Sequence, residues 1–209
     1  MDSGAFTELK DHGCYRDPVE VYAGQVERWS RCGNMVVAVS QDYMCEPFIL
    51  ERTGLTVEDH QQLTIERYEE LLALVPPSIY ILPVVQGYWP EEYVSHLKQY
   101  GPLLREGAWV GVGSVCKRNA RVEEIEGVLL TVKRKRPDLR LHGFGVKFTA
   151  LASQTVRDCL YSADSMAWSY AARMEGRNAN DWREAAAFVA QIEDQKVRRK
   201  DYQERLFHG

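Results

Sequence analysis

Short apolar runs alternate along the chain with longer segments whose apolar residues recur at the spacing of a helix. The runs are rich in β-branched residues and predict buried strands at 34–40, 78–85, 108–113 and 139–145. The longer segments predict helices at 20–30, 56–75, 90–100, 120–136, 149–162 and 180–207. Segment 163–174 begins as the end of a strand and turns helical. Strands that alternate with helices in this way indicate parallel β–α units.

Capping residues support the boundaries of several of these helices. Thr56 stands at an N-cap position, and Pro90 stands in the first turn of its helix. Gly101 follows the end of the helix that Pro90 begins. Pro137 stops the helix that Asn119 is expected to cap.

Polar residues or glycines follow each expected strand, at positions 2–4, 41–42, 86–87, 111–113, 142–145 and 164–165. In a (β/α)8 barrel the carboxyl ends of all strands meet at one mouth, whereas an open doubly wound sheet gathers its function at a switch point. The repeated strand ends favour an α/β fold of the (β/α)8 TIM-barrel type. Asp2 already stands at a strand end, so we expect the barrel to lack its first one or two strands. Residues 1–177 are predicted to form this barrel, and residues 178–209 a charged C-terminal helical tail.

Composition narrows the class of protein. The 209 residues are 45% hydrophobic and carry a net charge of −4, so a polyanion would have to meet a local basic surface rather than a bulk positive charge. No apolar run approaches the roughly 18 residues of a membrane span, and no signal peptide is expected. The 5 cysteines are widely spaced, which predicts reduced thiols and a cytoplasmic protein.

Three carboxylates stand at different strand ends, namely Asp2, Asp42 and Asp164. Each one alone is equally consistent with a helix cap or a loop acid. Together with Gln86 they suit a planar, amide-rich ligand such as a purine, because a carboxylate accepts two adjacent N–H donors and an amide donates to a carbonyl. Phe6 and Phe144 are candidates to stack on its faces. If one of the three carboxylates binds the base, the other two permit displacement at a sugar carbon, one as nucleophile and one as proton shuttle.

Five short motifs follow one another along the chain: DSGAF at 2–6, PVVQG at 83–87, GVGS at 111–114, HGFG at 142–145 and ADSMAWSYAAR at 163–173. In this order they resemble the motifs of the tRNA-guanine transglycosylase superfamily. The resemblance covers about residues 2–175. It implies the barrel fold and the exchange of a guanine in a polynucleotide for a 7-deazaguanine, with the backbone left intact.

The resemblance implies a role for each of the three carboxylates, two of them catalytic and one in base binding. Asp164 matches the nucleophile that attacks C1′ of the sugar. Asp2 matches the general acid/base that handles the proton on the departing or incoming base, and Asp42 matches the acid that reads the guanine-like edge.

The same resemblance implies a set of base-binding residues. Gln86 and the Gly111–Gly113 turn match the groups that hold the base carbonyl, and Phe6 and His142 fall where the family sandwiches the ring. The other residues of these motifs that we assign to base binding are Ser3, Gly87 and Gly143.

Members that modify tRNA carry a C-x-C-x-x-C…H zinc site after the nucleophile segment, but the last cysteine here is Cys159, before Asp164. The resemblance therefore favours the compact, zinc-free DpdA-like branch that modifies DNA, and no metal or other cofactor is expected. The expected enzyme is a pentosyltransferase that replaces guanine in DNA by a preQ0-like 7-deazaguanine through a covalent intermediate on Asp164. The alternatives are a transglycosylase acting on tRNA (queuine or archaeosine type) or free nucleosides, and a non-catalytic partner subunit.

The expected partners are DNA, or tRNA in the alternative, the 7-deazaguanine base, and a second copy of the chain or a helper protein. No membrane is expected among them. Lys117, Arg118 and Arg173 are predicted to contact the nucleic-acid backbone because they lie close in sequence to the site strands. The basic clusters at 133–136 and 196–200 are more typical of solvated helix ends.

Overall fold

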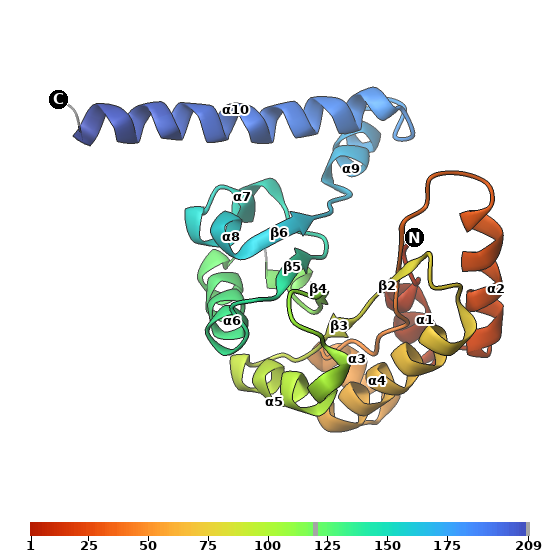
Figure 1. Ribbon diagram of the computed structural model, residues 1–209. Coiled ribbons are helices and arrows are strands. Elements are labelled where there is room, and N and C mark those ends of the chain that lie inside the picture. Colours follow the sequence, from red (N-terminus) through yellow and green to blue (C-terminus); the bar gives the residue numbers. More distant parts are fainter. Residues whose placement is uncertain (119–120, 208–209) are drawn as a thin grey trace.

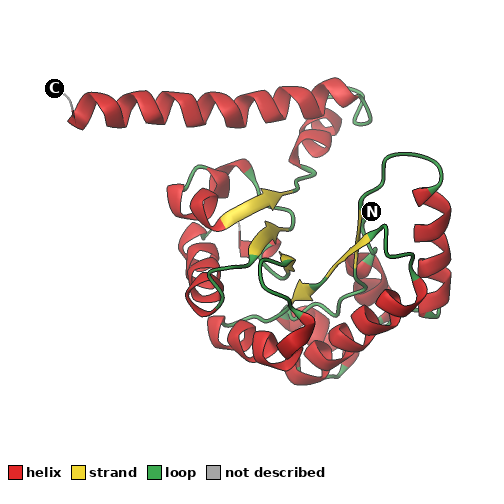
Figure 2. Ribbon diagram, in the orientation of Figure 1, coloured by secondary structure: helices red, strands yellow, loops and turns green. Residues whose placement is uncertain are grey.

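Parallel strands lie along the inside of an arc of helices in the computed structural model (Figure 1, Figure 2). The structure describes residues 1–118 and 121–207, without the side chains of Lys117 and residues 195–207. Strand β1 (Val37–Val39) pairs with β2 (Tyr80–Leu82). A second sheet has the order β3 (Val84–Val85), β4 (Trp109–Val112), β5 (Arg140–Gly143) and β6 (Leu160–Ala163), and all of these pairings are parallel.

The two sheets meet at Pro83, which splits the strand predicted at 78–85 into β2 and β3. Proline lacks the N–H that a ladder needs. Its carbonyl still accepts from the N–H of Gly111 at 2.8 Å, and the carbonyl of Leu82 accepts from Ser40 at 3.0 Å. The described strands therefore lie side by side in chain order, so their carboxyl ends face the same edge.

Helices follow the strands and cover one side of them (Figure 2). They include α2 (Val19–Ser30), α4 (Val57–Leu74), α5 (Pro90–Tyr100) and α6 (Val122–Lys135), with the 3-10 turns η1 (Gly101–Leu103) and η2 (Cys116–Arg118) between them. The predicted helices at 20–30, 56–75 and 90–100 are confirmed, and Thr56 forms a capping box with Asp59. The predicted cap Asn119 lies outside the described residues. The main core, between helices and strands, contains Leu71, Tyr93, Val110, Leu129 and Leu141.

The single helix predicted at 149–162 is wrong. The structure instead has α7 (Phe148–Leu151), α8 (Gln154–Cys159) and then β6. Ser153 starts α8, because its side chain accepts a hydrogen bond of 3.2 Å from the N–H of Val156. The residues after Cys159 extend and pair with β5, which places Asp164 directly after a strand.

Two helices near the front of the chain were not predicted. They are α1 (Ala5–His12) and α3 (Pro47–Thr53), and they pack together through a small hydrophobic cluster of Ala5, Leu9, Tyr15, Tyr43, Met44 and Ile49. Residues 1–4 are not a strand, contrary to the strand end expected there, but Met1 runs beside β1. Its amine donates to Val37 at 2.8 Å, and its carbonyl accepts from Val39 at 2.9 Å.

The chain ends in α9 (Ala167–Met174) and α10 (Trp182–Phe207). The segment predicted as one helix or a helix pair at 180–207 is one helix, which extends away from the strands (Figure 1). Phe188 near its start contacts Phe148, with ring centroids 6.5 Å apart. The predicted boundary between residues 177 and 178 falls in the turn between α9 and α10 and stays a prediction.

Candidate active site

The predicted acids converge on one pocket of about 410 Å³ at the carboxyl ends of the strands. Asp2 enters it from the segment before α1, and Asp42 from the loop after β1. Gln86 follows β3 and Asp164 follows β6. The other predicted residues that line it are Ser3, Phe6, Gly113 and Phe144. Residues from far apart in the sequence thus form one site, as expected when parallel strands point the same way.

Asp42 is the buried acid of the pocket, with 7% of its surface exposed. Its Oδ2 accepts a hydrogen bond from Nε2 of Gln86. Burial raises the pKa of Asp42 to about 7, although the hydrogen bond from Gln86 opposes the rise and nearby Asp2 and Glu46 add to it. Asp42 therefore retains a proton to higher pH than an exposed aspartate does, and a protonated carboxyl group accepts fewer hydrogen bonds than an ionised one.

The backbone of Gln86 is held from two sides. Its N–H donates to Nδ1 of His96 at 2.8 Å, and its carbonyl accepts from Nε2 of Gln61 at 2.8 Å. Burial lowers the pKa of His96 to about 3, so the imidazole is neutral and can accept this bond. Gln86 therefore starts from a fixed backbone and has its side chain aimed into the pocket.

Ser114 extends the polar network behind Gln86. Its Oγ lies 2.8 Å from Oε1 of Gln86 and 2.8 Å from Oε2 of the buried Glu46. The N–H of Cys45 donates to the same Oγ at 3.1 Å. Ser114 has a positive φ of 55°, a conformation uncommon outside glycine, which marks a constrained turn after β4.

Asp164 faces the pocket with a largely exposed side chain, 58% by relative area. Its Oδ1 accepts a 2.6 Å hydrogen bond from the N–H of Gly145, and Nε2 of His142 lies 3.8 Å from the same oxygen. The backbone N–H of Asp164 donates to Gly143 at 3.2 Å. The carboxylate is thus oriented by the turn after β5 while its free side remains open, as a nucleophile requires.

His142 lies behind the pocket rather than on its wall. Its Nδ1 is 2.9 Å from Oγ of Ser162, which accepts a bond of 3.0 Å from Nε1 of Trp109. Burial lowers the pKa of His142, and the charge of Asp164 opposes that change. The ring meets Phe144 edge to face with centroids 4.8 Å apart, and Phe144 lines the pocket. Of these two aromatic candidates, Phe144 lines the pocket, and His142, within β5, lies behind it.

Asp2 is exposed, and its Oδ1 accepts a long hydrogen bond of 3.4 Å from the N–H of Gly4. Gly4 has φ 76°, a left-handed conformation that turns the chain into α1. This turn brings Phe6 to the pocket, where its ring is 39% exposed and packs edge-on against Phe48 with centroids 6.5 Å apart.

The comparison with protein families agrees with this arrangement. A family model described as DpdA, DeoxyPurine in DNA protein A, matches residues 1–184. The chain belongs to the DpdA family. No curated protein matches the chain. Membership of the DpdA family confirms the resemblance found in the motifs and implies an enzyme that modifies DNA in a deazapurine pathway.

Two glycines of the DpdA motifs leave space for neighbouring side chains of the site. A Cβ on Gly113 would lie 2.6 Å from Oε1 of Gln86, and a Cβ on Gly111 would lie 2.6 Å from the Phe144 ring. Their N–H groups donate along the sheet to Val85 and Pro83. Both N–H groups are thus bonded within the sheet, and the predicted part of the Gly111–Gly113 turn in holding the base carbonyl stays a prediction.

Gly87 and Gly143 do not line the pocket. A Cβ on Gly143 would meet Val146 at 2.7 Å, and a Cβ on Gly87 would meet Tyr93 at 3.0 Å. Both positions thus demand close packing beside the site. Their predicted part in base binding stays a prediction.

Nine pocket residues of this DpdA chain escaped the sequence-based assignment. They are Gly4, Ala5, Thr7, Val39, Met44, Ser114, Cys116, Gly145 and Met166. Ser114, Gly145 and Met166 lie within the quoted motifs, so their position next to assigned residues was the available signal. Met44 and Cys116 follow site residues by two or three positions and carry no motif of their own.

The three predicted backbone contacts differ in their surroundings. Arg118 is 6% exposed, and its guanidinium donates to the carbonyls of Tyr88 and Ser114 and lies over the Tyr88 ring. That burial weighs against a contact with phosphate. Arg173 is exposed on α9. The side chain of Lys117 lies outside the described residues.

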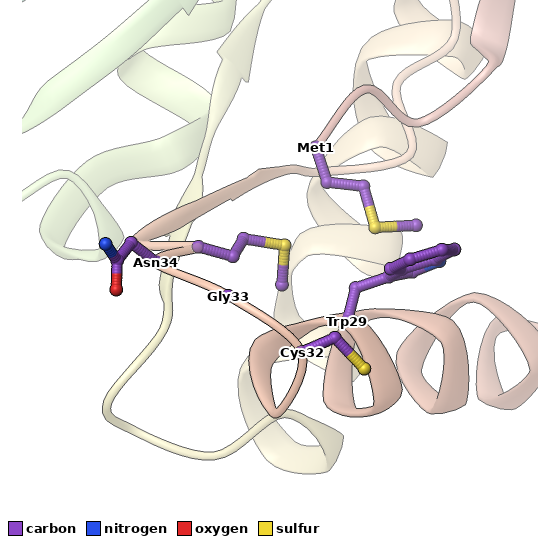
Figure 3. A pocket seen from close by; sticks show the side chains of 6 residues that line it. Met1, Trp29, Cys32, Gly33 and Asn34 are labelled. Carbon is purple, nitrogen blue, oxygen red and sulfur yellow. The ribbon is translucent and has the colours of Figure 1, made fainter.

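A second cavity, of about 470 Å³, lies between the N-terminus and the end of α2 (Figure 3). It is lined by Met1, Trp29, Cys32, Gly33, Asn34 and Met35. None of these is among the predicted site residues, and the lining carries no carboxylate. This cavity therefore lacks the carboxylates that the predicted chemistry requires.

The described part of the chain holds no group of three or more His, Cys, Asp or Glu side chains that could bind a metal ion. No helix among the described residues is long and apolar enough to cross a membrane. The expectation that the enzyme needs no metal stays a prediction.

Proposed function

We propose that the protein exchanges guanine in DNA for a 7-deazaguanine of the preQ0 type. The observation that carries the proposal is the meeting of Asp2, Asp42, Gln86 and Asp164 in one pocket of about 410 Å³. A cavity of that size suits a purine with part of its sugar. DNA is the substrate that DpdA membership implies, and the exchanged base is our finer inference.

Base recognition would fall to the buried end of the pocket. The ionised carboxylate of Asp42 accepts two N–H donors from the guanine edge, and an N–H of Gln86 donates to the guanine carbonyl. Phe6 and Phe144 line the same pocket and offer ring faces and edges to the base.

The chemistry would proceed by two displacements at C1′. A carboxylate oxygen of Asp164 bonds to C1′ as the glycosidic bond breaks, and Asp2 gives its proton to the departing guanine. The 7-deazaguanine then bonds to C1′ through N9, returns the N9 proton to Asp2 and releases Asp164. Both carboxylates end as they began, and the phosphate backbone is untouched.

The target nucleotide must leave the DNA stack to reach this pocket, because the acids line a concave pocket at the carboxyl ends of the strands that a stacked base cannot enter. Arg173, exposed on α9 two turns beyond Asp164, is our candidate for a phosphate contact on that path. Such a contact would position the strand without reading sequence.

We further propose that the arc of strands is part of a (β/α)8 barrel. Neighbouring strands follow chain order, all pairings are parallel, and helices cover one side. An open doubly wound sheet would reverse its strand order at a switch point, and the described strands have no such reversal. A cytoplasmic location and reduced cysteines remain part of the same proposal.

The test is incubation of the protein with duplex DNA and preQ0, followed by digestion and mass spectrometry of the nucleosides. We expect the deazanucleoside in DNA, no product with the Asp164→Asn variant, and full product in the presence of a chelator. A parallel reaction with tRNA tests the alternative substrate. Modified tRNA beside unmodified DNA would refute the assignment. Size-exclusion chromatography, alone and with candidate helper proteins, tests whether a second copy or a partner is required.

A further inference from the structure

The polar network behind the pocket contains two buried acids, Asp42 and Glu46. If both acids are ionised, the network has too few hydrogens for the hydrogen-bond contacts that its atoms make. Asp42 and Glu46 are the buried carboxyl groups among the residues whose burial the structure describes. Gln86 and Ser114 connect them, through Nε2 of Gln86 to Asp42 and through Oγ of Ser114 to Glu46 at 2.8 Å.

Ser114 has one hydroxyl hydrogen and two lone pairs. One lone pair accepts from the N–H of Cys45 at 3.1 Å. The hydrogen faces two oxygens, Oε1 of Gln86 and Oε2 of Glu46, each at 2.8 Å. It bonds to one of them, so the other contact needs a hydrogen from a different source.

The two orientations of the Gln86 amide place that hydrogen on different acids. With Nε2 toward Asp42, Ser114 donates to Oε1 of Gln86, and Glu46 must be protonated to donate to Ser114. With the amide reversed, Ser114 donates to an ionised Glu46, and Asp42 must be protonated to donate to Gln86. Amide orientation is assigned from such networks, and each assignment here contains one carboxyl proton.

We propose that Asp42 and Glu46 hold one proton between them, and that its position, set through Ser114, fixes the Gln86 amide and thereby selects the base. Glu46 and Ser114 are then positioning residues that act through Gln86. The identity of the selected base rests on the proposed function, whereas the shared proton does not.

The proton's position changes what the pocket offers to a purine. With the proton on Glu46, Asp42 is an acceptor for two N–H groups, and the second hydrogen of Nε2 on Gln86 is free for a carbonyl. That pattern matches guanine and 7-deazaguanines. With the proton on Asp42, the amide presents oxygen, which repels the carbonyl of guanine and suits an amino group such as that of adenine. Binding of guanine therefore draws the proton to Glu46 without releasing it.

Several titratable groups surround the pair. Among the described side chains, those coupled to it include Asp2, Tyr15, Tyr22, Cys45, Tyr93 and Tyr100. Burial raises the pKa of Tyr15, Tyr22, Cys45, Tyr93 and Tyr100, so these groups are neutral near pH 7. The described neighbours that carry charge include the exposed Asp2, Glu92 beside Cys45, and Arg118, whose Nε donates to the Ser114 carbonyl at 3.3 Å. The raised pKa of Asp42 agrees with a proton retained in this network.

Infrared spectroscopy of the free protein tests the shared proton directly. A buried protonated carboxyl gives a C=O band that moves on carboxyl ¹³C-labelling of Asp and Glu. We expect one such group in the wild type near pH 7 and none in Glu46→Gln, whose amide supplies the hydrogen to Ser114. The exposed control Glu58→Gln keeps the band. No band or two bands in the wild type, or a band that survives in a folded Glu46→Gln, overturns the proposal.

Addition of guanine separates sharing from a proton that belongs to Asp42 alone, and it needs only the wild type. Sharing predicts that the protonated band persists in the complex and that calorimetry in buffers of different ionisation enthalpy records no net proton release. A lone protonated Asp42 predicts loss of the band and release of one proton, which overturns the proposal.

The same titrations with adenine test base choice. Ser114→Ala frees the amide, so we expect its preference for guanine over adenine to fall at least tenfold, while Glu46→Gln retains it. An unchanged preference in Ser114→Ala overturns the selection role. If guanine fails to bind the wild type, the selection role falls with the proposed function, and the free-protein spectrum still decides the shared proton.

Discussion

Gln86 lies so close over Gly113 that a Cβ atom on the glycine would sit 2.6 Å from Oε1 of the amide. Real Cβ atoms do not approach other atoms that closely. Only a glycine at position 113 therefore leaves space for the side chain of Gln86, which follows the neighbouring strand β3. Gly113→Ala must push Gln86 away from Asp42. We expect base affinity to fall at least tenfold and the free energy of unfolding to fall by about 1–3 kcal/mol.

Gly127→Ala is the matched control for this change. Gly127 lies within α6, and a Cβ there would meet nothing within 4 Å. The substitution should leave base affinity unchanged and raise stability by up to about 1 kcal/mol, because alanine favours a helix. Base titration and urea denaturation measure both effects. Equal base affinity in the two variants would contradict the proposed fit between Gly113 and Gln86.

Asp164→Asn should abolish exchange and leave the fold intact. Its side chain is 58% exposed, so the loss of charge costs little in packing, while an amide cannot form the glycosyl ester. Denaturing electrophoresis should show a covalent DNA adduct with the wild type and none with the variant. Asp158→Asn, an exposed change on α8, should behave as wild type. Turnover near the wild-type rate in Asp164→Asn would place the nucleophile elsewhere.

The raised pKa of Asp42 predicts how stability depends on pH. The pKa of Asp42 in the folded state is about 7 and the ordinary pKa of an aspartate is 3.8, so between these pH values the folded state holds a proton that the unfolded state has lost. The contribution of Asp42 to stability is therefore largest below about pH 4 and declines as pH rises toward 7. Relative to wild type, Asp42→Asn should gain stability over that range and level off above it. Urea denaturation across the range measures the difference, and a constant difference would refute the shift.

Base selection should depend on the same carboxyl group. Guanine needs ionised Asp42 as an acceptor and leaves the shared proton on Glu46, so wild-type affinity for guanine should change little with pH near 7, because binding releases no proton. In Asp42→Asn the preference for guanine should be weak at every pH, because an amide cannot accept both donors. A guanine preference in the variant equal to that of wild type would remove Asp42 from base reading.

Substitution of Arg118 should affect stability, whereas substitution of Arg173 should affect DNA binding. Arg118→Ala removes a buried guanidinium from two carbonyls and should lower the free energy of unfolding by about 2–4 kcal/mol. Arg173→Ala, at an exposed position, should leave stability unchanged and weaken DNA binding in a salt-dependent way. Denaturation curves and DNA titrations at two salt concentrations distinguish them. If Arg118→Ala were as stable as wild type and its DNA binding were weakened in a salt-dependent way, Arg118 rather than Arg173 would be the phosphate contact.

Elements with strong local signals were predictable from sequence alone. Helix α5 runs from Pro90 to Tyr100 as expected, because proline fixes its first turn and Gly101 ends it. The short helices α1 and α3 were missed, since Ala5–His12 and Pro47–Thr53 are held by contacts with each other rather than by their own pattern. Residues 160–163 read as helix because four residues do not define a period.

The part of the candidate site that could be predicted is the part indicated by the order of the motifs along the chain. The acids and Gln86 share a pocket, as the strand ends indicated. That Phe144 lines the pocket while His142 lies behind it could not be predicted, because it depends on which side chain of β5 and its turn points into the pocket. The network of Ser114 with Glu46 was also hidden, since the two residues are 68 positions apart and meet only through the fold.

Helix α1 belongs to a hydrophobic cluster separate from the main core. A small cluster has a low local opening free energy, so this unit should exchange its amide hydrogens faster than β4 and β5. Hydrogen-exchange mass spectrometry would measure the difference, and equal protection would contradict it. Local opening of α1 would move Phe6 away from the pocket while the strands keep Gln86 and Asp164 in place. The aromatic side of the pocket would then be less stable than the side that carries the polar residues after β3 and β6.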